Sequence, residues 1–204
     1  MIVAVDYGEK KCGVSYGEVL PRKTIVVPTS KLKEVIAELK PTIVVFGLPI
    51  SMSGRYSTQT FKVVRSALSF SRKYKVYLCD ERMTTKIAKR ISKEDDKVSA
   101  SLIFQTFVQN QGGCWEVCDP RERKSVKEKG NKALVYEFPD PDVEIEASEV
   151  LVVTRNPVLA YFYHERGYFV ERELREEKYD LILAGKDCDR LREFLIDGGR
   201  LVCL

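Results

Sequence analysis

The sequence predicts a mixed α/β fold that is followed by a second, smaller α/β domain. Three short runs typical of strands open the chain, and the first two are separated by a charged turn that contains Gly8. Segments with helical spacing of apolar residues then alternate with apolar runs as far as Gly112-Gly113. After a lysine-rich stretch, DPRERKSVKEKGNK, which is expected to be a linker or surface loop, the alternation begins again. We therefore expect two domains, at residues 1–113 and 114–204.

Five strands are expected in the first domain, at five short runs that are bounded by turn residues or charges. They are Ile2–Val5, Cys12–Val19, Lys23–Pro28, Thr42–Phe46 and Val76–Cys79. The fourth run, TIVVF, is continuously apolar after its first residue, which is typical of a strand buried on both faces. Gly47-Leu48-Pro49 is expected to end it.

Helices are expected where apolar residues recur every three or four positions. The predicted helices of the first domain are Lys31–Lys40, a segment around Phe61–Leu68, a segment around Lys86–Ser92, and about Asp95–Gln109. Ser30 is a good N-cap for the first of them, and Thr84 and Thr85 can cap the third.

The second domain is expected to contain strands and helices in alternation. The predicted strands are Glu149–Val153, Tyr168–Arg172, Asp180–Ala184 and Arg200–Leu204, and the predicted helices are Pro157–Arg166 and Leu191–Leu195.

The net charge of +4 is unevenly distributed along the chain. Residues 1–113 carry 19 Lys and Arg against 10 Asp and Glu, whereas residues 114–204 carry 15 against 20. A basic half joined to an acidic half favours a polyanionic partner for the first half. An ordinary solvated surface is the alternative, and charge alone does not decide between the two.

The composition is typical of a soluble protein. No apolar stretch approaches the roughly 18 residues of a membrane span, and the chain does not begin with a basic leader, an apolar stretch and a small-residue cleavage site. We therefore expect a cytoplasmic protein without a membrane partner. The six cysteines are scattered and form no CxxC pair, so they are expected to be reduced core residues.

Acidic residues stand at the ends of several predicted elements. Asp6 follows the first strand, Asp80 and Glu81 follow the fifth, and Asp95 and Asp96 begin the last helix of the first domain. In open α/β sheets, ligands gather beyond the carboxyl ends of strands. Carboxylates that converge there repel one another unless a cation joins them, and hard oxygen ligands suit Mg²⁺ or Mn²⁺. Two such ions can clamp the attacking and leaving oxygens of a phosphodiester displacement.

Each of these acids also has a structural alternative. Asp6 could be a turn former, Asp80 or Glu81 an exposed strand end, and Asp95 and Asp96 favourable charges at a helix N-terminus.

Four stretches of the first 110 residues resemble the YqgF/RuvX family. The family's opening hairpin is similar to VDYGEKKCGV at residues 5–14, and its Gly-Leu-Pro loop to VVFGLPISMSG at 44–54. Its DER signature is very similar to CDERMTT at 79–85, and its Asp-led final helix resembles DKVSASLIFQTF at 96–107. These ribonuclease H-like proteins are described as Holliday junction resolvases and as nucleases that mature the 5′ end of 16S ribosomal RNA. Family members usually stop after that helix, so the second domain is not typical.

The resemblance implies a ribonuclease H-like mixed sheet of five strands in the order 3-2-1-4-5, with strand 2 antiparallel and helices on both faces. It also implies that Asp6, Glu81 and Asp96 are the catalytic residues and hold Mg²⁺ or Mn²⁺, with Asp80 and Asp95 as stand-ins. Strand 5 would lie two strands from strand 1, roughly 10 Å away, so Glu81 would have to reach in or act through water.

Contacts to nucleic-acid phosphates are expected from Lys10 and Arg82, and from Ser57 and Thr58 in the polar loop after the Gly-Leu-Pro motif. For the two cations, a solvated charge is the alternative. The second domain has a faint resemblance to the later strands of a Rossmann-like methyltransferase, but a glycine-rich cofactor loop is missing upstream. We expect an accessory or dimerisation domain without a cofactor, and in the second case the protein would be a homodimer.

These features predict a Mg²⁺-dependent endonuclease that hydrolyses phosphodiesters in structured RNA or branched DNA. Maturation of the 5′ end of pre-16S ribosomal RNA is favoured over Holliday junction resolution. The first alternative is a non-catalytic nucleic-acid-binding or scaffold protein that keeps the fold. The second is a phosphotransferase of the sugar-kinase and actin superfamily, which is less favoured because the second half offers no matching glycine-rich phosphate loop.

Overall fold

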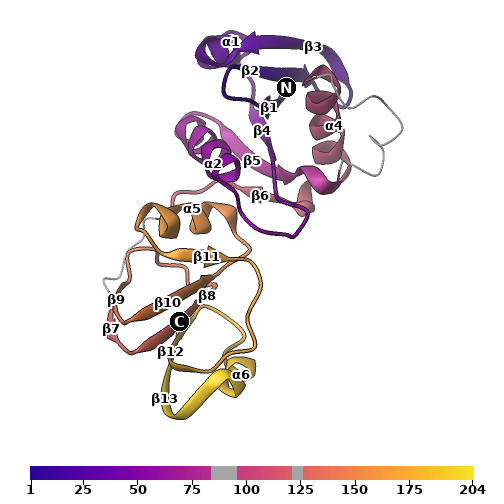
Figure 1. Ribbon diagram of the computed structural model, residues 1–204. Coiled ribbons are helices and arrows are strands. Elements are labelled where there is room, and N and C mark those ends of the chain that lie inside the picture. Colours follow the sequence, from indigo (N-terminus) through magenta and orange to yellow (C-terminus); the bar gives the residue numbers. More distant parts are fainter. Residues whose placement is uncertain (84–95, 121–125) are drawn as a thin grey trace. The chain divides into compact units, whose positions relative to one another are not determined.

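The computed structural model describes residues 1–83, 96–120 and 126–204 (Figure 1). It divides the chain into two compact units. Unit 1 comprises Met1–Ser53 and Ser57–Cys118, and unit 2 comprises Gly54–Tyr56 and Asp119–Leu204. Among the described residues, no helix is both long and apolar enough to cross a membrane.

Unit 1 is built on a six-stranded mixed sheet in the order β3-β2-β1-β4-β5-β6. Its strands are β1 (Ile2–Tyr7), β2 (Lys11–Gly17), β3 (Pro21–Pro28), β4 (Ile43–Leu48), β5 (Lys75–Asp80) and β6 (Cys114–Glu116). β1, β4 and β5 are parallel, whereas β2 is antiparallel to both of its neighbours. The predicted order 3-2-1-4-5 with an antiparallel second strand is confirmed. The sixth strand, antiparallel to β5, was not predicted.

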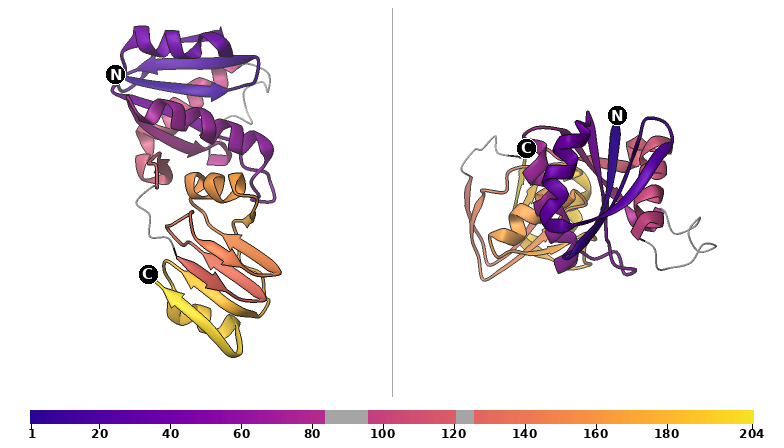
Figure 2. Two further views of the ribbon diagram at one scale, coloured as in Figure 1. Left: turned by 90° about the vertical axis from the view of Figure 1, so that its left-hand side faces the viewer. Right: turned by 90° about the horizontal axis from the view of Figure 1, so that it is seen from above.

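Helices cover both faces of this sheet (Figures 1 and 2). The described helical elements of unit 1 are η1 (Thr29–Lys31), α1 (Leu32–Leu39), α2 (Thr58–Ser71), η2 (Glu81–Met83), α4 (Asp96–Gln109) and η3 (Gln111–Gly113). Side chains alternate along a strand, so the neighbouring residues Val45 and Phe46 of β4 lie on opposite faces of the sheet. Val45 joins the apolar cluster that contains Phe104 of α4, whereas the ring of Phe46 lies 5.7 Å from that of Phe70 on α2.

Two strands of unit 1 continue further than the sequence predicted. β1 does not end before Asp6, because Asp6 pairs with Gly13 of β2 in the antiparallel ladder. β4 does not end at Gly47, because Gly47 pairs with Cys79 of β5 and the strand stops only before Pro49. Both Asp6 and Gly47 are therefore held by sheet hydrogen bonding rather than by turns.

The helix predicted at Lys31–Lys40 begins differently. The 3-10 turn η1 precedes α1, so the N-cap of α1 is Lys31, which makes no side-chain cap bond. The prediction of Ser30 as N-cap is therefore wrong. The helix predicted around residues 86–92, with its caps Thr84 and Thr85, lies outside the described residues.

Unit 2 is built on a parallel five-stranded sheet in the order β11-β10-β8-β12-β13. Its strands are β8 (Lys132–Tyr136), β10 (Glu149–Val153), β11 (Phe169–Glu171), β12 (Tyr179–Ala184) and β13 (Leu195–Cys203), and its helices are α5 (Pro157–Glu165), α6 (Cys188–Leu191) and the 3-10 turn η4 (Arg192–Phe194). Apolar clusters lie on both faces of the sheet. The predicted small C-terminal α/β fold is confirmed.

A second, two-stranded parallel sheet of unit 2 was missed by the sequence analysis. It consists of β7 (Lys127–Lys129) and β9 (Glu144–Glu146). β7 lies inside the stretch predicted as a linker or surface loop. Its lysines pair across the ladder with glutamates of β9, at 2.7 Å for Lys127 and Glu144. Opposite charges across strands, rather than apolar alternation, thus mark this pair.

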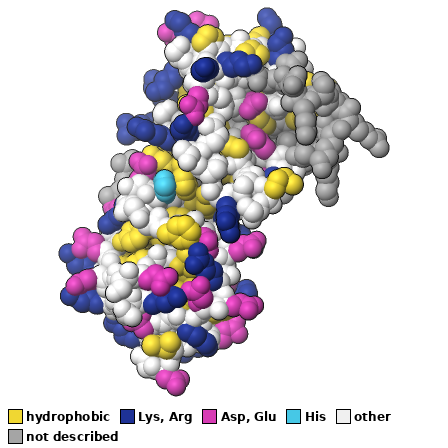
Figure 3. Space-filling model, viewed as in Figure 1, with side chains coloured by type: hydrophobic (Ala, Val, Ile, Leu, Met, Phe, Trp, Pro, Cys, Tyr) yellow, Lys and Arg dark blue, Asp and Glu magenta, His cyan; other side chains and the backbone are white. Residues whose placement is uncertain are grey.

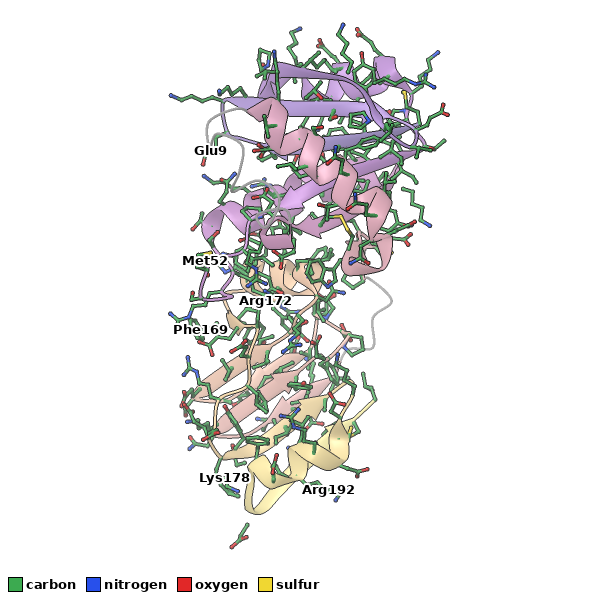
Figure 4. All side chains as sticks on the ribbon, turned by 90° about the vertical axis from the view of Figure 1, so that its right-hand side faces the viewer. Glu9, Met52, Phe169, Arg172, Lys178 and Arg192 are labelled. Atoms are coloured by element: carbon green, nitrogen blue, oxygen red, sulfur yellow. A yellow bond between two sulfur atoms is a disulfide. The ribbon has the colours of Figure 1, made fainter. Side chains whose placement is uncertain are left out.

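The segment Gly54–Tyr56 is fixed inside unit 2. The hydroxyl of Tyr56 donates to the carbonyl of Thr154 at 3.0 Å. The guanidinium of Arg172, labelled in Figure 4, lies 5.6 Å from the centre of the Tyr56 ring and donates to the carbonyl of Gly54 at 3.3 Å. Burial raises the pKa of Tyr56 above its usual value. A cationic guanidinium over an aromatic face is a stabilising contact.

Four of the six cysteines form disulfides, so the prediction of reduced thiols is wrong for them. Cys79 and Cys114 face each other across β5 and β6, with 4.4 Å between their Cα atoms, and Cys188 is bonded to Cys203. Cys12 and Cys118 are not disulfide-bonded. Sequence spacing could not show these pairs, because each depends on strands or helices that come together only in the fold.

We predict that two thiols and not six react when the protein, purified without reductant, is alkylated in denaturant. The labelled residues should be Cys12 and Cys118, identified by peptide mass spectrometry. A sample reduced before alkylation is the control and should carry six labels. Six labels without prior reduction would contradict the disulfides.

Candidate metal centre

Asp6 lies near the carboxyl end of β1, where the parallel strands β1, β4 and β5 end on the same edge of the sheet. Its backbone is fixed by pairing with Gly13, and its side chain is partly exposed. Glu9, in the turn after β1, and Met52, in the loop after β4, lie on the same side of unit 1 (Figure 4). Asp6 is therefore held at the edge of an open α/β sheet where ligands usually bind.

Asp80 ends β5, and its carboxylate is bonded to Arg82. The buried carboxylate of Asp80 accepts from the backbone N–H of Arg82 at 2.9 Å. The Arg82 guanidinium donates to both carboxylate oxygens, at 3.1 Å from Nε and 2.7 Å from Nη2. These charge-assisted bonds close the turn that starts η2. They give Asp80 a structural role and draw Arg82 toward it, so the proposed phosphate contact of Arg82 and the stand-in role of Asp80 stay predictions.

Glu81 follows Asp80 and lies over β4. A Cβ atom placed at Gly47 would lie 2.6 Å from Oε1 of Glu81, and it would also collide with the side chain of Ile103 on α4. Any side chain at position 47 would therefore have to displace the Glu81 carboxylate or the end of the Ile103 side chain. β4 lies between β5 and β1, so Glu81 extends across the intervening strand toward Asp6.

The negative charge of Asp6 acts on Glu81. Burial, together with the negative charges of Asp6 and then Asp80, raises the pKa of Glu81 to about 7. Converging carboxylates of this kind favour either a proton or a cation between them. The donor set consists of hard oxygen atoms, which fits Mg²⁺ or Mn²⁺ rather than a softer metal.

The third predicted ligand, Asp96, begins α4, whose Ile103 and Phe104 pack on the sheet face that carries Val45. Its side chain and the whole of Asp95 lie outside the described residues. The described side chains alone contain no group of three or more potential His, Cys, Asp or Glu ligands. The structure thus brings Glu81 toward Asp6, and the part of Asp96 in the site stays a prediction.

The remaining predicted contact residues lie around the same edge. Lys10 is exposed in the turn between β1 and β2. Ser57 is the N-cap of α2 and forms a capping box with Thr60, and Thr58 is the first residue of that helix. The Ser57 hydroxyl therefore has a structural role at the helix start. Its contact with phosphate, and those of Thr58 and Lys10, stay predictions.

Sequence reasoning missed Gln59. Its side-chain amide donates to the backbone carbonyl of Tyr7 at 3.1 Å, which ties the first turn of α2 to the end of β1, one residue beyond Asp6. A glutamine in a first helical turn carries no sequence signal for such a contact. The signal for Gly47 was present, as a glycine inside an apolar β-branched run, but it was interpreted as a strand end.

The sheet of unit 2 has the strand order 3-2-1-4-5 of a doubly wound fold, with its switch point between β8 and β12. After β8 the described chain forms β9 and no helix before β10. Gly185, after β12, donates its N–H to the carbonyl oxygen of Tyr136 at 3.0 Å. A Cβ atom at Gly185 would collide with the carbonyl of Glu137. The helix start that holds a phosphate in dinucleotide-binding domains therefore has no counterpart after β8 in residues 126–204. The accessory or dimerisation role of this unit stays a prediction.

We predict that Gly47→Ala weakens divalent-cation binding and destabilises unit 1. The added methyl group must displace Glu81 or Ile103, and overpacking of this kind costs about 1–3 kcal/mol. Mn²⁺ affinity measured by calorimetry should fall, and chemical denaturation should show the loss of stability.

The matched control is Gly112→Ala, because a Cβ at Gly112 would have no neighbour closer than 4.0 Å. This variant should bind Mn²⁺ like the parent protein. Unchanged Mn²⁺ affinity in folded Gly47→Ala would contradict the role given to Gly47.

Comparison with known proteins supports one family for this chain. A family model described as RuvX, Holliday junction resolvase, matches residues 1–110. A "Putative pre-16S rRNA nuclease" of Thermotoga maritima is 59% identical over 206 residues, which cover 100% of this chain and 94% of the relative. A protein of the same name from Rickettsia akari is 32% identical over 132 residues, which cover 53% of this chain and 86% of that relative.

Among solved structures, RuvC of Thermus thermophilus in complex with a Holliday junction substrate matches with a TM-score of 0.42 and 15% identity, over 56% of this chain and 98% of that one. The match to the Thermotoga protein extends through unit 2 as well as unit 1. From the family model and this whole-length relative, we conclude that the chain belongs to the RuvX (YqgF) family.

Proposed function

We propose that this protein is a divalent-cation-dependent endonuclease that hydrolyses phosphodiester bonds in precursor 16S ribosomal RNA, in the cytoplasm. The Thermotoga maritima relative, which matches over the whole chain, carries the name "Putative pre-16S rRNA nuclease". The observation that carries the proposal is the position of Glu81 over Gly47, which brings a second carboxylate toward Asp6 at the carboxyl edge of the sheet.

Three acidic residues would hold the cation: Asp6 on β1, Glu81 at the start of η2, and Asp96 at the start of α4. Bound Mg²⁺ or Mn²⁺ would supply Lewis-acid stabilisation of the charge that develops on the phosphate and the leaving 3′ oxygen.

The chain's own contribution is to hold these ligands in place. Pairing with Gly13 fixes the backbone of Asp6, and the bonds between Asp80 and Arg82 fix the turn from which Glu81 projects. Ligands held on rigid elements need little reorganisation when the substrate binds, and preorganisation of this kind is a large part of catalysis. Lys10, exposed in the turn after β1, would neutralise a phosphate of the substrate.

We predict that Asp6→Asn lowers cleavage of a labelled pre-16S RNA at least about 100-fold while the RNA still binds. Loss of an outer partner of a metal ligand already costs about 10- to 100-fold, and loss of a ligand should cost more. EDTA should abolish cleavage by the parent protein.

The matched control is Glu38→Gln, which removes one exposed carboxylate from α1 in the same unit. It should cleave like the parent. A four-way DNA junction, tested beside the RNA, distinguishes ribosomal RNA maturation from junction resolution. Cleavage that survives in Asp6→Asn would overturn the assigned site, and binding of RNA and junction without cleavage by the parent would favour a non-catalytic scaffold.

A further inference from the structure

The cations of unit 1 are concentrated in one part of the chain. From residue 39 to residue 79 the sequence contains seven Lys or Arg and no Asp or Glu. Within this stretch α2 and the turn that follows it carry exposed Lys62, Arg65, Arg72 and Lys73. Figure 3 shows Lys and Arg side chains gathered on the surface over α2.

These four residues form a row on the outer side of the helix. Lys62 and Arg65 are three positions apart and Arg65 and Arg72 are seven apart, so all three share one face of an α-helix. The opposite face is buried, with Val63, Val64, Ala67 and Phe70 in the core. We call Lys62, Arg65, Arg72 and Lys73 the α2 basic row.

The α2 basic row starts at the candidate metal centre. In the first turn of α2, Gln59 donates to the carbonyl of Tyr7, which follows Asp6. One turn later, Lys62 forms an ion pair with Glu9 in the turn after β1. From Lys62 to Lys73 the row spans 11 residue steps, which is about 16 Å at 1.5 Å per residue. The row therefore leads away from the acidic edge along one direction.

The cations at the far end of the α2 basic row are not neutralised by acidic residues of the described chain. Arg65, Arg72 and Lys73 are exposed and form no ion pair with any residue that the structure describes. A helix C-terminus favours a cation, which accounts for one charge near Arg72 but not for the whole row. Closely spaced cations with no acidic neighbour repel one another, and a polyanion relieves that repulsion.

We propose that the α2 basic row is a backbone-binding path for the nucleic-acid arm that flanks the cleavage site. This inference rests on the proposed function for its substrate and extends it by naming the surface and the chemistry of binding. A length of about 16 Å spans roughly five phosphates of one strand of a double helix, at about 3.4 Å each. The interactions are with phosphates, so they position the substrate without reading its sequence.

The test is the double variant Arg65→Gln/Arg72→Gln. Binding of a fluorescein-labelled RNA duplex, and of a DNA duplex of the same sequence, is measured by anisotropy in EDTA, so that no strand is cut. The Kd should rise about tenfold or more. The slope of log K against log salt should fall in magnitude by about 2, because each arginine that is replaced leaves one phosphate without its cation.

The matched control is Arg155→Gln/Arg190→Gln, which removes two exposed arginines from unit 2 and changes the net charge equally. It should keep the parent's Kd and salt slope. An unchanged Kd for the α2 variant, an equal weakening in the control, or no duplex binding by the parent protein would each overturn the proposal.

Failure of the proposed function gives a different result. If the parent protein binds the duplexes but cuts no RNA in Mg²⁺, the nuclease function fails, and the path along α2 is still decided by the two double variants. If the parent cuts RNA and the α2 variant binds like the parent, only the path fails.

Discussion

The central constraint in unit 1 is the absence of a side chain at Gly47. This glycine lies inside β4, between the strand that carries Asp6 and the strand that leads to Glu81. A single methyl group there would occupy the space of the Glu81 carboxylate and of Ile103. Glycine in a strand interior weakens the strand, and it often marks a close approach of other atoms. Here the approach is that of a carboxylate from the end of β5 toward β1.

Neighbouring contacts fix the elements around Gly47 and Glu81. Asp80 and Arg82 fix the turn after β5, and Ile103 of α4 packs over the same glycine from the helical layer. The arrangement has an electrostatic cost, because burial and the charges of Asp6 and Asp80 raise the pKa of Glu81 to about 7. A site that keeps two carboxylates in unfavourable proximity is typical of a functional centre, and a cation would convert the repulsion into attraction. The α2 basic row begins beside the same edge, which links the proposed chemistry to the proposed path of the substrate.

Much of the fold could be predicted from the sequence, because its elements are local. β10 was predicted with its observed bounds, and Asp6 was singled out because an acid after a β-branched run is conspicuous. The strand order came from the resemblance to a family rather than from periodicity. Glu81 was expected to need a long reach, because strand 5 lies roughly 10 Å from strand 1. The close approach over Gly47 could not be seen in a sequence, because it requires three strands to be placed side by side.

The other differences between the sequence predictions and the structure also come from contacts between segments that are far apart in the sequence. The pairing of Cys79 with Cys114 depends on β6, which is only three residues long and has no apolar alternation. β7 is formed by charge pairs with β9, a strand that follows it by more than a dozen residues. The membership of Tyr56 in unit 2 depends on Thr154 and Arg172, about a hundred positions away. Each is a long-range contact between short elements, for which local propensity carries little information.

The most direct measurement of the central claim is anomalous diffraction from crystals of the protein soaked in Mn²⁺. The account predicts a strong anomalous peak at the carboxyl edge of the unit 1 sheet, in direct contact with carboxylate oxygens of Asp6 and Glu81 and beside the backbone of Gly47. A peak that contacts neither residue, or an Asp6–Glu81 pair that stays free of Mn²⁺ at saturating concentration, would contradict it.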